Sequence, residues 1–97
     1  MRLAPHEIAA IKAAAAQAFG PEAVVRLFGS RVDDAKRGGD IDLHVEVTDD
    51  DAVSKEMRFR AELWERLDEE PVDVVVHRRG AEGRWIDQIA YRDGIVL

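Results

Sequence analysis

The sequence predicts an α/β (α+β) domain in which a small mixed sheet is flanked by helices. Residues 5–19 and about 51–69 have the apolar spacing of amphipathic helices, and residues 40–47 alternate apolar and polar side chains with period two. Short runs rich in β-branched residues at 23–28 and 72–77 predict two further strands. A third helix is expected over 85–92 and a short last strand over 95–97. Helices and strands mixed in this order are typical of a small sheet covered by helices.

The composition predicts one compact domain, residues 1–97. A chain of 97 residues with 46% hydrophobic residues has room for one modest core. It has no cysteine, so disulfides and thiolate metal sites are excluded. We see neither a signal peptide nor a run of the roughly 20 apolar residues that cross a bilayer. A cytoplasmic protein without membrane contact is expected, and the net charge of −6 argues against broad nucleic-acid binding.

The predicted helices each present an apolar row that we expect to face the core. In the first helix the row is Ile8, Ile11, Ala15, Ala18 and Phe19; in the second it is Val53, Met57, Ala61, Trp64 and Leu67, with Leu63 adjoining; in the third it is Trp85, Ile86, Ile89 and Ala90. Trp64 could be a platform for a nucleic-acid base. We interpret it as core, because a tryptophan on an apolar helix row is usually packed inside.

The strand predicted over 40–47 carries the strongest chemical signal of the chain. Alternation places Asp40 and Asp42 on the same, polar face, about 6–7 Å apart at a rise of ~3.3 Å per residue. Two such carboxylates repel each other and raise each other's pKa, and a divalent cation relieves the conflict. Oxygen ligands suit Mg²⁺, which is held by one or two carboxylates together with substrate phosphates. Asp-x-Asp alone also occurs on solvated strand edges.

The segment before this strand is suited to phosphate. Gly29 lets the backbone approach a ligand closely, and Ser30 is a good cap for a helical turn whose free N–H groups attract anions. Arg31 can grip phosphate oxygens with its fork of N–H groups. Basic residues Lys36 and Arg37 and the pair Gly38–Gly39 follow, while Asp33 and Asp34 are interpreted as turn formers. A Gly-Ser turn after a strand is by itself common.

A third carboxylate lies in the strand predicted over 72–77. Asp73 stands between valines, and burying an aspartate there is costly unless it is paired or bound to metal. The alternative is a strand-end aspartate that accepts hydrogen bonds from a loop.

The combination of these motifs resembles a known family. The first motif is Gly29-Ser30-Arg31 and the second is Asp40-Ile41-Asp42-Leu43, with nine residues between Ser30 and Asp40. Together they are similar to the signature of the nucleotidyltransferase superfamily related to DNA polymerase beta. The loop is one residue shorter than the commoner family spacing. The resemblance is greatest to the minimal single-domain nucleotidyltransferases of prokaryotes, some of which act as antitoxins beside a HEPN-type partner protein.

The resemblance implies a metal-dependent transferase of the EC 2.7.7 type. Asp40, Asp42 and Asp73 would be its catalytic and metal-binding residues, with two Mg²⁺ ions, and Gly29, Ser30 and Arg31 would bind the nucleotide. The substrate would be ATP, and the acceptor a hydroxyl, such as a tyrosine of a small helical HEPN-type toxin. The alternative is a non-catalytic antitoxin, a binding module that inhibits its partner by contact.

Overall fold

A computed structural model describes residues 3–32, 40–48 and 51–97. Helix α1 (Pro5–Phe19) leads into strand β1 (Val24–Phe28) and a short 3₁₀ turn, η1 (Gly29–Val32). Strand β2 (Ile41–Val47), helix α2 (Ala52–Arg66), strand β3 (Val72–Arg78), helix α3 (Trp85–Asp93) and strand β4 (Ile95–Val96) follow. The predicted fold class is confirmed, because three helices and one mixed four-stranded sheet make up the described residues.

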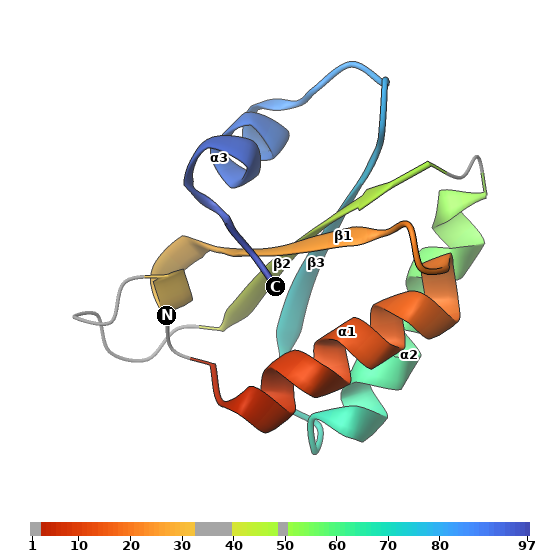
Figure 1. Cartoon of the computed structure of the whole chain (residues 1–97), viewed down its shortest axis with the longest axis vertical. Helices are drawn as coiled ribbons and strands as arrows, with labels where there is room; N and C mark the ends of the chain where they lie inside the picture. Colours follow the sequence, from red (N-terminus) through yellow and green to blue (C-terminus); the bar gives the residue numbers. More distant parts are fainter. Residues whose placement is uncertain (1–2, 33–39, 49–50) are drawn as a thin grey trace.

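The sheet has the strand order β3-β2-β1-β4 (Figure 1). Strands β1 and β2 are antiparallel, as are β1 and β4, whereas β2 and β3 run parallel. A parallel pair needs a long crossover connection, and α2 supplies it. Strand β4 pairs with β1 although it is the last element of the chain, because the chain passes through α3 before it returns to the sheet.

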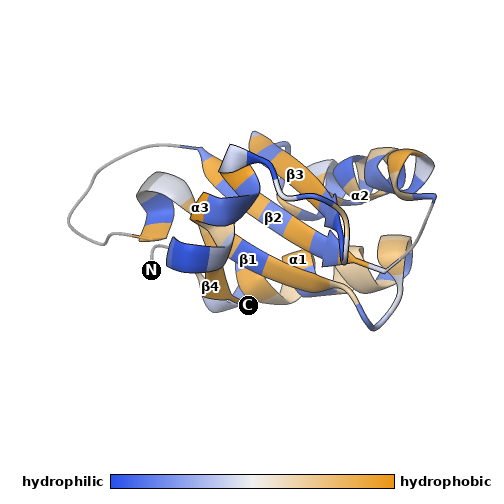
Figure 2. Cartoon of the chain, turned by 90° about the horizontal axis from the view of Figure 1, so that it is seen from above, coloured by the Kyte–Doolittle hydropathy of each residue, from blue (hydrophilic) through white to orange (hydrophobic). Residues whose placement is uncertain are grey.

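The hydrophobic core lies between one face of the sheet and the two helices α1 and α2, which lie side by side (Figure 1). The alternation along β2 is visible as bands of opposite hydropathy in Figure 2. Its odd positions Ile41, Leu43, Val45 and Val47 are all buried, as the period of two predicted. Phe19 of α1 meets Phe59 of α2 with ring centroids 5.4 Å apart, which joins the two helices.

The core-facing row of α2 differs from the predicted one. Phe59, Leu63 and Leu67 are buried, but Val53, Met57 and Trp64 are 81%, 71% and 52% exposed. The interpretation of Trp64 as a core residue is therefore wrong. The helix carries two apolar rows, and only the row through Phe59 is turned toward α1 and the sheet.

Helix α3 crosses the other face of the sheet, where polar contacts hold it (Figure 2). Trp85, predicted to face inward, is 74% exposed, and only Asp87 and Ala90 of this helix are buried. The reason is that the sheet face beneath α3 is itself polar, so the helix meets it with Asp87 rather than with an aromatic side chain. None of the helices in the described ranges could span a membrane.

Candidate functional site

The two strongest candidate carboxylates face each other on neighbouring strands. Strands β2 and β3 run parallel with Asp42 directly opposite Asp73, and each is the second residue of its strand. The Asp73 carboxyl is close enough to Asp42 to raise its pKa. The sheet therefore brings together residues that are separated by α2 in the sequence.

The turn after β1 closes the site on its other side. Phe28, the last residue of β1, pairs with Asp42, so Gly29 follows immediately beside that carboxylate. Gly29 has a φ of +78°, and a β-carbon placed on it would overlap the Asp42 carboxylate. Glycine is required here both by the left-handed backbone and by the lack of space.

The electrostatics of Asp42 are strongly perturbed. Burial, followed by the charge and hydrogen bond of Asp73 and the charge of Asp40, raises the pKa of Asp42 to about 6. A carboxylate in this state gains from a nearby cation, which offsets both the burial and the repulsion. The all-oxygen donor set of Asp42 and Asp73 fits a hard ion such as Mg²⁺.

Asp73 is more exposed than the sequence suggested, and Asp40 is exposed as well. Both are on the surface, so the cost of burying Asp73 between valines does not arise. Among the described residues, one group of three His, Asp or Glu side chains has ligand atoms that all lie within 4.8 Å of one another. That group contains none of the three predicted aspartates and is discussed below. The charge of Asp40 contributes to the raised pKa of Asp42. The carboxylates of Asp40, Asp42 and Asp73 do not, however, form a group of three as close as that one.

The predicted phosphate-binding residues lie next to this pair, in η1. Arg31 donates from Nη2 to Oε1 of Glu70 at 2.8 Å, and both side chains are largely covered. Glu70 stands just before β3, so the ion pair joins η1 to the start of the strand that carries Asp73. The backbone of Ser30 belongs to η1. The predictions for Asp33, Asp34, Lys36, Arg37 and Gly38–Gly39 lie outside the described residues.

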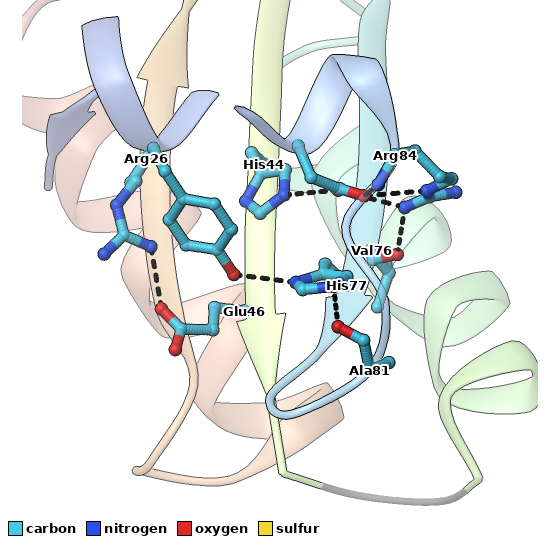
Figure 3. Close-up of polar contacts among 9 residues, drawn as sticks. Arg26, His44, Glu46, Val76, His77, Ala81 and Arg84 are labelled. Carbon is cyan, nitrogen blue, oxygen red and sulfur yellow. Dashed lines mark hydrogen bonds and ion pairs between the residues drawn. The ribbon is translucent and has the colours of Figure 1, made fainter. Parts of the chain in front are cut away.

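A buried polar network, not predicted from the sequence, continues along the same face of β2 (Figure 3). His44 and Asp87 are both fully buried, and His44 Nε2 donates to Asp87 Oδ1 at 2.8 Å. Arg84 binds the same carboxylate from its backbone N–H and its guanidinium at 2.8–3.1 Å. Burial by itself raises the pKa of Asp87, but the hydrogen bonds from Arg84 and His44 hold it well below the ordinary value.

The rest of the network joins α3 to all three long strands. His77 donates from Nε2 to the carbonyl of Ala81 at 3.1 Å, so its Nδ1 accepts the hydroxyl of Tyr91 at 2.8 Å. Arg26 lies over the Tyr91 ring, 4.7 Å from its centroid, and pairs with Glu46 at 2.9 Å. The ring nitrogen Nδ1 of His44 is buried and has no hydrogen-bond partner among the described residues.

His44, His77 and Asp87 are the three side chains close enough together to suggest a metal site. Both ring nitrogens of His77 and both oxygens of Asp87 are already in hydrogen bonds, and the positive charge of Arg84 lies against Asp87. A cation would have to displace these bonds and approach a guanidinium. The group therefore fits a role in attaching α3 to the sheet. Only the histidine on the polar face of β2 hinted at it, since nothing in the sequence relates positions 44 and 87.

Fold and site together define a small α/β domain with a paired-carboxylate site at the end of its sheet where β1 ends and β2 and β3 begin. No protein-family model matches the chain, and no curated protein matches it either.

Proposed function

We propose that the chain is a metal-dependent nucleotidyltransferase that moves a nucleoside monophosphate, AMP from ATP, to a hydroxyl group. The observation that carries the proposal is the register that sets Asp42 opposite Asp73 with Gly29 against Asp42. The proposal is supported by the resemblance of the Gly29-Ser30-Arg31 and Asp40–Leu43 segments to the polymerase beta-like superfamily. Within that superfamily, the chain would be a minimal member that works beside a HEPN-type partner. The raised pKa of Asp42 marks a carboxylate suited to a bound cation.

Asp42 and Asp73 would hold Mg²⁺, with Asp40 adding negative charge beside them, and a second ion would share Asp73. The metal would neutralise the triphosphate and lower the pKa of the acceptor hydroxyl. Gly29 and the N–H groups of η1 would face the phosphates, and Arg31 would turn from Glu70 toward them. Asp73, the more exposed of the pair, would take the proton of the hydroxyl. The new bond joins that oxygen to the α-phosphorus, and the bond to pyrophosphate breaks.

The decisive variant is Asp42→Asn. Asparagine keeps the shape of the aspartate side chain but removes the charged metal ligand. The variant is expected to fold, because the ionised form of Asp42 is already disfavoured in the folded chain. We would incubate the chain with Mg²⁺, α-labelled ATP and a candidate partner, a small helical HEPN-type protein. Label should pass to that protein with the wild type and with Asp93→Asn, an exposed control, but not with Asp42→Asn. Transfer by Asp42→Asn at the wild-type rate would refute the proposal.

One observation favours the alternative, an antitoxin that acts by contact alone. Arg31, the predicted phosphate ligand, is engaged with Glu70 within the protein. In that case the candidate partner would be inhibited without becoming labelled, and Asp42→Asn would inhibit it as well as the wild type does.

A further inference from the structure

The outward face of α2 carries an apolar row that the protein itself does not cover. Val53, Met57 and Trp64 are 81%, 71% and 52% exposed, and Ala61 between them is exposed as well. Steps of four, four and three residues place them in one line along the helix, about 16 Å long at ~1.5 Å per residue. We call this line the outer α2 row. It is distinct from the core row through Phe59, and such a contiguous exposed row is typical of an interaction surface.

The outer α2 row ends at a hollow next to the proposed active site. A cavity of about 260 Å³ lies between Arg60 and Trp64 of α2 and residues 72–74 of β3, a segment that includes Asp73. A partner that lies along the row and reaches this hollow would therefore come to the strand that holds the catalytic carboxylate.

The free edge of β3 favours a helix over a strand as the occupant. β3 is the last strand of the sheet on this side, so its outer backbone groups have no neighbouring strand. Arg60 donates to the carbonyl of Val74 at 3.0 Å, and Arg84 to that of Val76 at 2.8 Å. An added strand would have to displace both arginines from these carbonyls, whereas a helix can lie against the outer α2 row and leave both hydrogen bonds in place.

The negative charge beside Trp64 indicates the charge that the partner carries at this end of the row. A second hollow is lined only by Trp64 and the acids Glu65, Asp68 and Glu69. A second copy of the chain would bring the same acids and a net charge of −6 to this face. Basic side chains would be attracted instead.

We propose that the outer α2 row, with the acids beside Trp64, docks a basic amphipathic helix of the acceptor protein. Its apolar residues would pack along the row, and its lysines or arginines would meet Glu65, Asp68 and Glu69. The identity of the occupant as the acceptor rests on the proposed function; the docking does not need nucleotide.

The test uses a pair of synthetic helical peptides of about 18 residues, long enough to match the row. Both carry the same leucine row, flanked by lysines in one and by glutamates in the other. In Trp85→Phe, Trp64 is the only tryptophan left of the two, so its fluorescence reports binding. The lysine peptide should give a saturable change in emission and bind at least about tenfold more tightly than the glutamate peptide. The difference should shrink in about 0.5 M salt, where surface charges are screened.

Met57→Glu places a charge in the middle of the row and should weaken the lysine peptide by about tenfold or more. Val96→Glu adds the same charge to another exposed apolar residue, on β4, and should leave binding unchanged. Equal affinity for the two peptides, or equal effects of the two substitutions, would overturn the proposal. So would concentration-dependent sedimentation of the chain alone that Met57→Glu abolishes, because the occupant would then be a second copy.

The docking proposal and the transfer proposal can fail separately. Asp42→Asn should bind the lysine peptide like the wild type, since the row is intact. Normal docking with no label transfer by the wild type would contradict the proposed reaction alone. Met57→Glu should retain ATP binding but label the candidate partner at least about tenfold more slowly; full labelling by this variant would contradict the docking surface alone.

Discussion

Gly29→Ala tests the contact between the turn after β1 and the candidate carboxylate. Gly29 has a φ of +78°, and a β-carbon at this position would overlap the carboxylate of Asp42. Gly80 offers a matched control: its φ is +87°, but nothing lies within 4 Å of the added β-carbon. Both alanine variants suffer the same backbone penalty, and only Gly29→Ala must also displace a side chain.

The structure lets the two contributions be separated. The left-handed conformation costs a non-glycine residue about 1–2 kcal/mol, which is the full expected loss for Gly80→Ala. Displacing the Asp42 carboxylate adds about 1–3 kcal/mol, a typical cost of overpacking, so Gly29→Ala should lose about 2–5 kcal/mol of unfolding free energy. Each kcal/mol lowers the melting temperature of a domain of this size by about 4–8 °C.

Urea denaturation of both variants, repeated in an Asp42→Ala background, measures these quantities. Without the carboxylate, the nearest remaining atom of residue 42 is its β-carbon at 3.4 Å, an ordinary contact. Gly29→Ala should then cost no more than Gly80→Ala. If the excess cost of Gly29→Ala persists after the carboxylate is removed, the turn and Asp42 are not packed as described and the reasoning fails.

Four further outcomes are expected. Asp73→Asn should lower the pKa of Asp42 below about 6, while burial still keeps it above its ordinary value; carboxyl ¹³C NMR measures it, and an unchanged pKa would contradict the pairing. Wild-type stability relative to Asp42→Asn should rise as pH falls from 7 toward 4, because the folded chain binds this proton more tightly than the unfolded chain. Asp87→Ala should cost about 3–5 kcal/mol in a thermal or urea melt, since it leaves the buried His44 without its carboxylate and the more exposed Arg84 without its ion-pair partner; a loss below ~1 kcal/mol would argue against the network. Glu70→Gln should tighten Mg²⁺–ATP binding up to about fivefold by releasing Arg31 from an ion pair worth at most ~1 kcal/mol, and calorimetry showing weaker binding would refute this.

The predicted elements agree closely with the structure because they depend on local patterns. The period of two in β2 comes directly from the backbone, and all four of its odd-numbered apolar residues are buried. Helix α1 has the predicted bounds; it begins at Pro5, and Gly20, with a φ of +91°, follows its last residue. Proline fits the first turn and glycine the end for reasons that need no tertiary contact. The helical turn predicted after β1 is also present, as η1.

The prediction of which side chains of α2 face the core was wrong, because tertiary packing decides how the helix is turned. The helix has two apolar rows, and hydropathy alone does not say which one meets the core. Phe59 was not placed in the predicted row, yet its contact with Phe19 of α1 decides how the helix is turned. Once α1 covers that side, Val53, Met57 and Trp64 remain on the surface.

The sequence by itself determined the order of helices and strands and the buried face of β2, because both follow from the periodicity of neighbouring residues. Only the tertiary structure decided that Asp73 meets Asp42, that Gly29 lies against it, and that His44 is bound to Asp87 beneath α3. These contacts join residues far apart in the chain, and their formation depends on strand register and helix rotation, which packing of the whole core sets.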